Sequence, residues 1–194
     1  MNKILVSAAF AAAMLAPSAA IAQAVPPAVI AIVDLDKVTT DCNACKSARA
    51  ALQSQATAIQ NREKSLAGPL QTEGQAIQKA LDALPQGKEP DAALQARITA
   101  FNTKRQQGAQ ELQRQQEQFQ RNTNYISQQI RTKLGPIYQQ VMQRRGANIM
   151  VELGTTLASG AALDVTNDVL AGLNAALPSV ATVAPAQAQT PQGR

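Results

Sequence analysis

The chain contains no tryptophan and no histidine among its 194 residues. Histidine is the commonest general base near neutral pH and a frequent metal ligand, so its absence weighs against an enzyme and against a cofactor. Aromatic side chains make up only 3% of the sequence. Because aromatic residues contribute much of the burial in a large core, we expect a small core and a protein that is not an enzyme.

Long apolar runs are missing after the first 22 residues. Within those residues, Lys3 precedes an apolar stretch over 4–15, and Ala20–Ala22 supplies a small-x-small cleavage pattern. This arrangement predicts a secretory signal peptide over residues 1–22 and a mature chain that starts at Gln23. No later run approaches the roughly 20 apolar residues needed to cross a bilayer. We therefore expect a soluble, exported protein, most simply in a bacterial periplasm.

Two long helices are predicted over residues 46–145, separated by the turn Pro85–Pro90. Their larger apolar residues recur mostly every three, four or seven positions, which places them along one narrow stripe of each helix. Positions 98, 105, 112, 119 and 126 follow strict intervals of seven, as in a left-handed coiled coil. The second seam position carries poor packing residues, so we expect an underpacked coil; these residues are Gly108, Gln115 and Asn122.

Short apolar segments flank this arm and are typical of strands. Val29–Val33 precedes the arm and Ala147–Val151 follows it, so a helical hairpin would bring both into one small sheet. We also predict a third strand over Thr155–Ser159 and a last helix from Asp164 to about Leu177. The predicted organisation is a body formed by residues 23–45 and 146–178, an arm over 46–145 and a flexible Ala/Pro/Gln tail over 179–194.

This organisation places the chain in the α+β class, with a long antiparallel coiled-coil hairpin on a small strand body. A small sheet is marginally stable alone, and its exposed edges invite pairing with another chain. Oligomerisation is the economical solution, because several copies can pool their strands into one core.

Charge is distributed unevenly between the arm and the rest of the chain. Residues 46–145 contain 15 Lys and Arg side chains against 7 Asp and Glu side chains. A basic arm favours anionic partners, such as acidic protein segments, anionic lipid or lipopolysaccharide. Export argues against nucleic acid as a partner. A solvated helix surface with a cationic bias would have the same composition.

Cys42-Asn43-Ala44-Cys45 is a C-x-x-C motif at the start of the predicted arm. A helix N-terminus lowers a thiol pKa, so one interpretation is a thiol-redox pair. A zinc site shared between subunits is a second, although no further Cys or His is present. A local disulfide formed in an oxidising compartment is favoured over both.

Three acidic residues precede the arm: Asp34, Asp36 and Asp41. Their spacing lacks the glycine and the terminal glutamate of a calcium-binding loop. Capping of helix N-termini explains them better, because short carboxylates accept hydrogen bonds from free backbone N–H groups.

The two ends of the mature chain carry a family resemblance. Ile30-Ala31-Ile32-Val33-Asp34, a long broken coil, Asn148–Val151 and then Leu163-Asp164-Val165-Thr166-Asn167-Asp168-Val169-Leu170 resemble the OmpH/Skp family of periplasmic chaperones. The resemblance implies a homotrimer with a small β-barrel body and three helical tentacles around a cavity. It also implies an ATP-independent holdase that keeps unfolded outer-membrane proteins from aggregating before their assembly.

The arm would then bind clients through cationic and apolar side chains. Long-range attraction would come from charge and loose retention from scattered apolar contacts. The candidate client-binding residues are Lys64, Leu66, Leu70, Lys79, Lys88, Leu94, Arg97, Ile98, Phe101, Lys104, Arg105 and Arg114. The C-x-x-C motif and the tail are additions that the family does not explain. Two other function classes stay open, a structural periplasmic spacer and a C-x-x-C thiol-redox protein.

Overall fold

The structure is a computed structural model that describes residues 25–185. The predicted signal peptide and residues 186–194 of the predicted tail lie outside the described residues. The elements follow in the order β1 (Ile30–Val33), α1 (Leu35–Asp41), α2 (Asn43–Asp82), α3 (Ala92–Arg145), β2 (Ile149–Glu152), η1 (Leu153–Thr155), η2 (Ala161–Leu163) and α4 (Thr166–Ala176).

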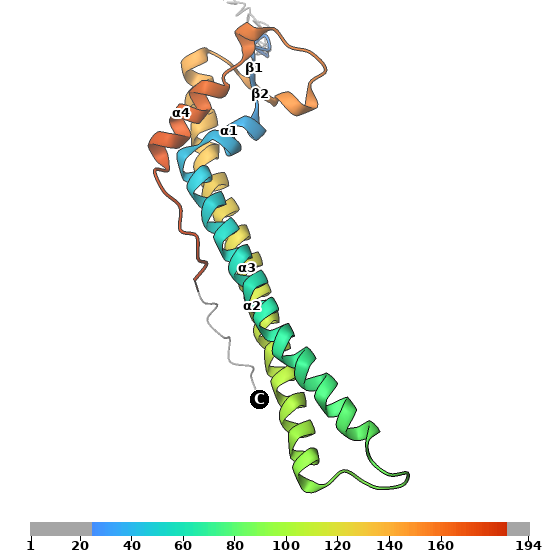
Figure 1. Cartoon of the computed structure of the whole chain (residues 1–194). Coiled ribbons are helices and arrows are strands. Elements are labelled where there is room, and N and C mark those ends of the chain that lie inside the picture. Colours follow the sequence, from blue (N-terminus) through green and yellow to red (C-terminus); the bar gives the residue numbers. More distant parts are fainter. Residues whose placement is uncertain (1–24, 186–194) are drawn as a thin grey trace, which may run out of the picture.

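A helical hairpin dominates the molecule and confirms the predicted arm (Figure 1). Helices α2 and α3 contain 40 and 54 residues, which corresponds to about 60 and 80 Å at 1.5 Å per residue. Asp91 caps α3 by accepting a 2.8 Å hydrogen bond from the Leu94 N–H. Gly146 ends α3 in the left-handed conformation, with φ of 66°, which glycine adopts without strain. Among the helices of residues 25–185, none combines the length and apolar character needed to span a bilayer.

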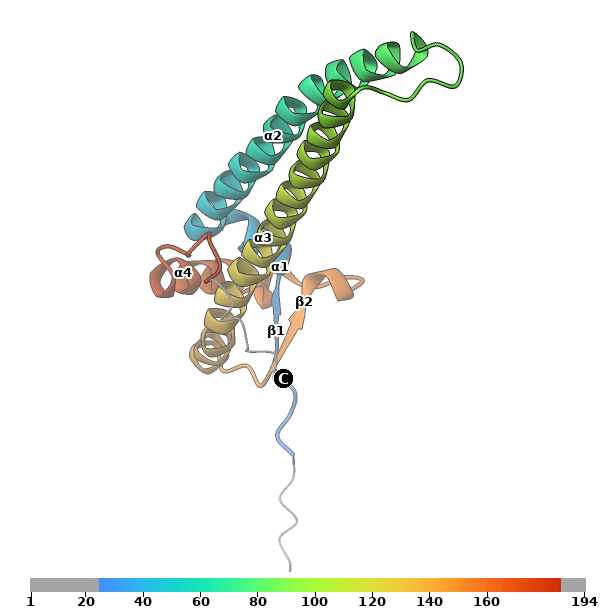
Figure 2. The same cartoon turned by 90° about the horizontal axis from the view of Figure 1, so that it is seen from below.

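A two-stranded parallel sheet closes the body end of the hairpin (Figure 2). Strand β1 pairs with β2 in the register Ile30↔Ile149 to Val33↔Glu152, so the whole arm is the crossover between the two strands. Asn148 extends this pairing, because its Oδ1 accepts a 2.7 Å hydrogen bond from the Val29 N–H. The predicted meeting of the two flanking runs is confirmed.

The predicted third strand over Thr155–Ser159 is wrong. Residues 153–155 form the short helix η1, and residues 156–160 have no regular structure. The hydroxyls of Thr155 and Thr156 donate hydrogen bonds of 2.9 and 3.0 Å to the Glu152 carbonyl. Such local bonds compete with strand pairing and turn the chain back on itself. Only an isolated bridge between Ile32 and Asp164 extends the sheet in the described part of the chain.

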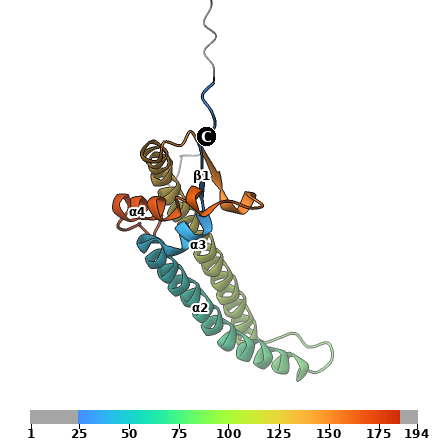
Figure 3. The same cartoon turned by 90° about the horizontal axis from the view of Figure 1, so that it is seen from above.

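The body core lies where α1, α4 and the C-terminal part of α3 meet (Figure 3). Helix α1 was not predicted; Asp34 caps it by accepting a 2.8 Å hydrogen bond from the Lys37 N–H, as its capping role requires. Helix α4 approaches α3 so closely that a Cβ atom at Gly172 would lie 2.9 Å from Cγ2 of Ile137. The largest fully buried side chains are those of Leu173, Val38, Val141, Val169 and Cys42.

Residues 179–185, the first part of the predicted flexible tail, contact the arm. This segment leaves α4 and lies along the arm (Figure 1), where Gln129 exchanges two hydrogen bonds with the backbone of Ala181. The low charge and the alanine, proline and glutamine content of the tail suggested a solvated chain. Backbone groups of the tail instead find partners in amide side chains of the arm.

Candidate functional site

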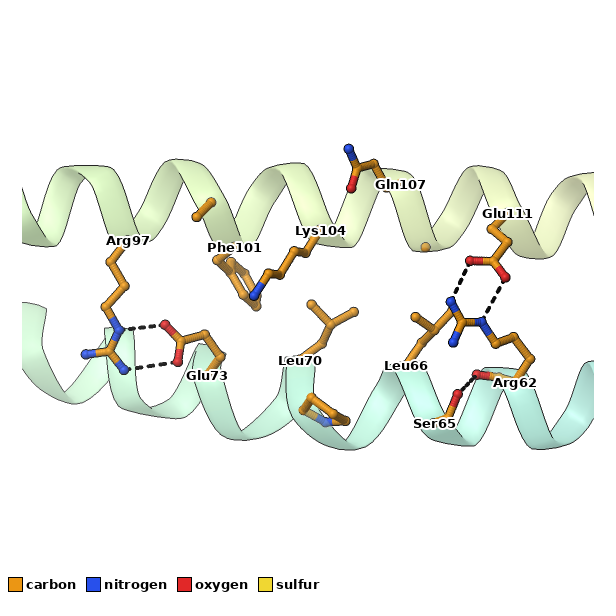
Figure 4. A pocket seen from close by; sticks show the side chains of 13 residues that line it. Arg62, Ser65, Leu66, Leu70, Glu73, Arg97, Phe101, Lys104, Gln107 and Glu111 are labelled. Atoms are coloured by element: carbon orange, nitrogen blue, oxygen red, sulfur yellow. Dashed lines mark hydrogen bonds and ion pairs between the residues drawn. The ribbon is translucent and has the colours of Figure 1, made fainter.

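The strongest candidate site is a hollow between α2 and α3 in the outer half of the arm. It has a volume of about 590 Å³ and opens to solvent along the hairpin (Figure 4). Leu66 and Leu70 on α2 face Phe101 on α3 across it, and all three side chains are half-buried. The hollow is an apolar surface that a passing chain can touch without being enclosed.

Glycines shape this part of the seam. A Cβ atom at Gly108 would lie 3.4 Å from Cδ1 of Leu66, and one at Gly74 would lie 3.4 Å from the ring of Phe101. The two large side chains therefore pack over the bare backbone of the opposite helix. The sequence predicted an underpacked coil because Gly108 lies at a seam position. The structure shows that Leu66 occupies the space that the missing side chain leaves.

Two ion pairs bound the hollow at its ends (Figure 4). Arg62 donates two 2.8 Å hydrogen bonds to the Glu111 carboxylate. Arg97 donates bonds of 2.6 and 3.1 Å to the Glu73 carboxylate. Paired, two-bond geometry of this kind fixes the register of one helix against the other.

The ion pairs also shift the titration of their members. The hydrogen bond from Arg97 lowers the pKa of the Glu73 carboxyl, and the bond from Arg62 does the same to the pKa of Glu111. The same hydrogen bonds raise the pKa values of the two arginines. All four groups are therefore charged at neutral pH, and each pair contributes no net charge to the hollow.

The predicted client-binding residues fall into three groups. Leu66, Leu70, Arg97, Phe101 and Lys104 line the hollow, although Arg97 is engaged by Glu73 and is not a free cation. Lys88 and Leu94 line a second hollow of about 430 Å³ near the hairpin tip, together with Arg97. The remaining predicted residues lie on the arm outside both hollows: Lys64, Lys79, Ile98, Arg105 and Arg114.

Most of the predicted cations are exposed and available to an anionic partner. Among the described residues, none forms an ion pair within 4.0 Å with Lys64, Lys79, Lys88, Lys104, Arg105 or Arg114. Of these six cations, Lys104 lines the larger hollow between α2 and α3. The arm thus offers free positive charge around apolar contacts, while Arg62 and Arg97 form ion pairs that link α2 to α3.

Sequence reasoning missed a polar junction closer to the body. The side chain of Asn122 is 3% exposed and lies between the two helices. Its Nδ2 donates a 2.8 Å hydrogen bond to Oε1 of Gln55, and its Oδ1 accepts a 2.7 Å bond from Nε2 of Gln118. Its seam position was the available signal, although a polar residue there was expected only to weaken the packing of the coil. A polar residue at such a position commonly specifies helix register.

Cys42 and Cys45 form a disulfide in the body core, with exposed fractions of 0% and 5%. Reactive cysteines are usually accessible to solvent, whereas this pair is buried. No cluster of three or more His, Cys, Asp or Glu side chains that could hold a metal ion occurs among residues 25–185.

The sequence and the fold both resemble known proteins. The family model for outer membrane proteins of the OmpH-like type matches residues 29–173. No curated protein sequence matches the chain. A crystal structure of an OmpH-like protein from Caulobacter crescentus CB15, proposed to be an outer membrane chaperone, aligns with a TM-score of 0.66 and 17% identity over 80% of this chain and 90% of that chain. At that identity the likeness establishes a shared fold.

Proposed function

The chain belongs to the OmpH-like family of outer membrane proteins, and we propose that it is an ATP-independent holdase chaperone of the bacterial periplasm. Its clients are unfolded outer-membrane proteins, which it keeps from aggregating before their assembly. The name of the Caulobacter crescentus protein supports a chaperone role for this fold. The signal-peptide pattern of residues 1–22 supports the location.

The observation that carries the proposal is the open hollow on the arm. Leu66, Leu70 and Phe101 offer apolar contact at a surface flanked by the free cation of Lys104. Unfolded barrel proteins expose apolar strand residues and often carry net negative charge. Free cations would attract them at long range, and shallow contacts would hold them weakly. Weak, numerous contacts allow release without an energy source.

Assembly into a homotrimer belongs to the same proposal. Ile30 and Ile149, paired in the sheet, are 41% and 42% exposed, and Leu157 in the following loop is fully exposed. A two-stranded sheet with apolar residues in solvent is marginally stable by itself. Three copies that pool these strands into a barrel would bury them and set three arms around a shared space.

Dilution of a urea-denatured outer-membrane barrel protein tests the proposal. Light scattering is followed with and without the purified protein, whose mass in solution is measured in parallel. We expect suppression near one trimer per client and a native mass of three chains. A folded trimer that leaves scattering unchanged contradicts the holdase function.

A structural spacer is the second candidate function. The ion pairs Arg62–Glu111 and Arg97–Glu73 favour it, because they stiffen the hairpin and neutralise part of its charge. A spacer predicts tight binding to an envelope component without suppression of aggregation. The scattering assay separates the two, because a holdase suppresses aggregation whether or not it binds vesicles of anionic lipid or lipopolysaccharide, whereas a spacer binds such vesicles and leaves scattering unchanged.

The burial of Cys42 and Cys45 argues against a thiol-redox function, because a redox pair must be reached by its substrate. A Cys42→Ser, Cys45→Ser variant tests it. Full chaperone activity of this variant, together with no disulfide exchange by the unmodified protein, would exclude that function.

A further inference from the structure

A polypeptide segment already occupies the base of the arm. Residues 179–185 follow α4 and lie against α2 and α3, where three side chains contact their backbone. The Gln129 amide donates a 2.9 Å hydrogen bond to the Ala181 carbonyl and accepts a 3.0 Å bond from the Ala181 N–H. Asn122 Oδ1 accepts a 2.8 Å bond from the Ala184 N–H. Nε2 of Gln55 donates a 3.2 Å bond to the Thr182 carbonyl.

All four of these hydrogen bonds involve the backbone of the segment. Its side chains alternate: Val180, Thr182 and Ala184 are half-buried, whereas Ala181 and Val183 are exposed, Val183 to 62%. The inward side chains are small or medium in size and uncharged. Because every polypeptide carries the same backbone donors and acceptors, this mode of binding places few demands on sequence.

The amides of the site also form hydrogen bonds within the arm that do not involve the segment. Asn122 is fixed by Gln55 and by Gln118, at 2.8 and 2.7 Å. Gln129 also donates a 3.2 Å bond to the Tyr125 carbonyl of its own helix. Gln55 comes from α2, while Asn122 and Gln129 come from α3, two turns apart. The row of three amides therefore follows the arm in the direction in which an extended chain would run.

We propose that Gln55, Asn122 and Gln129 form a binding site for extended polypeptide backbone, which residues 179–185 occupy as a built-in competitor and which a segment of an unfolded client takes over. The inference rests on the proposed holdase function and extends it to a specific site. An individual hydrogen bond contributes only a small net free energy, so the tail can exchange with a client. Occupancy by the tail lowers the apparent client affinity in proportion to the fraction of free sites.

Two shortened chains distinguish the effect of removing residues 179–185 from the effect of removing the residues that follow them. A chain ending at Pro178 lacks the competitor, and a chain ending at Pro185 retains every described contact of the segment. Each is combined with Gln129→Ala and, as a matched control, with Gln116→Ala, whose exposed side chain on α3 has no hydrogen bond to a described residue. The probe is a fluorescently labelled, urea-denatured outer-membrane barrel protein, titrated at fixed salt. A synthetic peptide of residues 178–185 serves as a second probe.

If the tail occupies about nine-tenths of the sites, the chain ending at Pro178 binds the client roughly tenfold more tightly than the chain ending at Pro185. Gln129→Ala removes this gain and Gln116→Ala preserves it. The synthetic peptide competes with the client for the shorter chain. Equal client affinities for the two shortened chains overturn the inference and leave the holdase function intact. Absence of client binding by every variant, each shown to be a folded assembly, contradicts the proposed function as well.

Discussion

Helix α3 crosses two regions that use it differently. In the body, Leu134, Ile137 and Val141 are 6%, 4% and 0% exposed and pack into a continuous core. In the outer arm, Leu94, Ile98 and Phe101 are half-buried and face one partner helix and solvent. The body encloses its apolar residues, whereas the arm leaves them reachable. A single helix thus supplies both the anchor in the body and one side of the proposed client-binding surface.

Replacing a leucine with alanine should give the largest difference in unfolding free energy between the body and the arm. Leu173→Ala in α4 removes a side chain with 0% exposure, and we expect it to lower the free energy of unfolding by about 2–5 kcal/mol. Leu70→Ala on the arm removes a half-buried leucine and should cost only about 1 kcal/mol. Urea unfolding followed by circular dichroism measures both. Equal losses would mean that the arm is packed like the body.

Replacing a helix glycine with alanine tests whether the body is packed more tightly than the arm, with Gly172 in the body and Gly108 in the arm. Gly172→Ala would place Cβ 2.9 Å from the branched Ile137 side chain, which has little freedom to move. We expect a loss of about 1–3 kcal/mol from overpacking. Gly108→Ala meets only the end of Leu66 at 3.4 Å, so the better helix propensity of alanine should make it neutral or stabilising. Thermal unfolding of the two variants gives the comparison, and destabilisation by both would contradict it.

Removal of the buried amide tests how far the polar junction holds the arm together. Asn122→Ala leaves Oε1 of Gln55 and the Ala184 N–H without their partner, and we expect a cost of about 1–2 kcal/mol. Hydrogen exchange at Ala184 should accelerate, while exchange in α4 stays slow. Unchanged exchange at Ala184 would show that the tail is held by other contacts.

Acidification should weaken the arm's ion pairs and have the smallest effect. The pKa values of Glu73 and Glu111 are lowered in the folded state, so their contribution to stability is complete above the unfolded pKa of about 4.3. It is lost as the pH falls through the lower folded pKa. The unmodified protein should therefore lose more stability between pH 7 and pH 3 than a Glu73→Gln, Glu111→Gln variant. Both carboxylates are partly exposed to solvent, so salt should reduce the difference. Parallel pH profiles would mean that the pairs add nothing.

The sequence predicted the parts of the fold that repeat a simple pattern. Long apolar periodicity indicated the hairpin, and two short apolar runs indicated β1 and β2. The false strand at Thr155–Ser159 arose because β-branched residues suit strands, while local hydroxyl bonds to Glu152 decide the actual turn. Helix α1 is seven residues long, too short for periodicity to reveal.

The candidate site was predictable in composition but not in pairing. Apolar spacing identified Leu66, Leu70 and Phe101, which the structure brings together. The partners Arg97–Glu73 and Arg62–Glu111 are separated by 24 and 49 residues, and they meet only because of the hairpin register. One sequence does not specify that register, so Arg97 was predicted to be a free cation. The contacts of residues 179–185 likewise depend on where α4 ends.

Site-specific photocrosslinking tests most directly whether the arm, rather than the body, holds the client. In one variant a benzophenone amino acid replaces Gln107, which is exposed and lines the hollow that also contains Leu66 and Phe101. In the other it replaces Thr40, which is exposed on α1 of the body. Each variant is mixed with a urea-denatured outer-membrane barrel protein on dilution and then irradiated. We expect efficient crosslinks from position 107 and few from position 40. Equal crosslinking from both positions, or crosslinking from position 40 alone, would contradict this expectation.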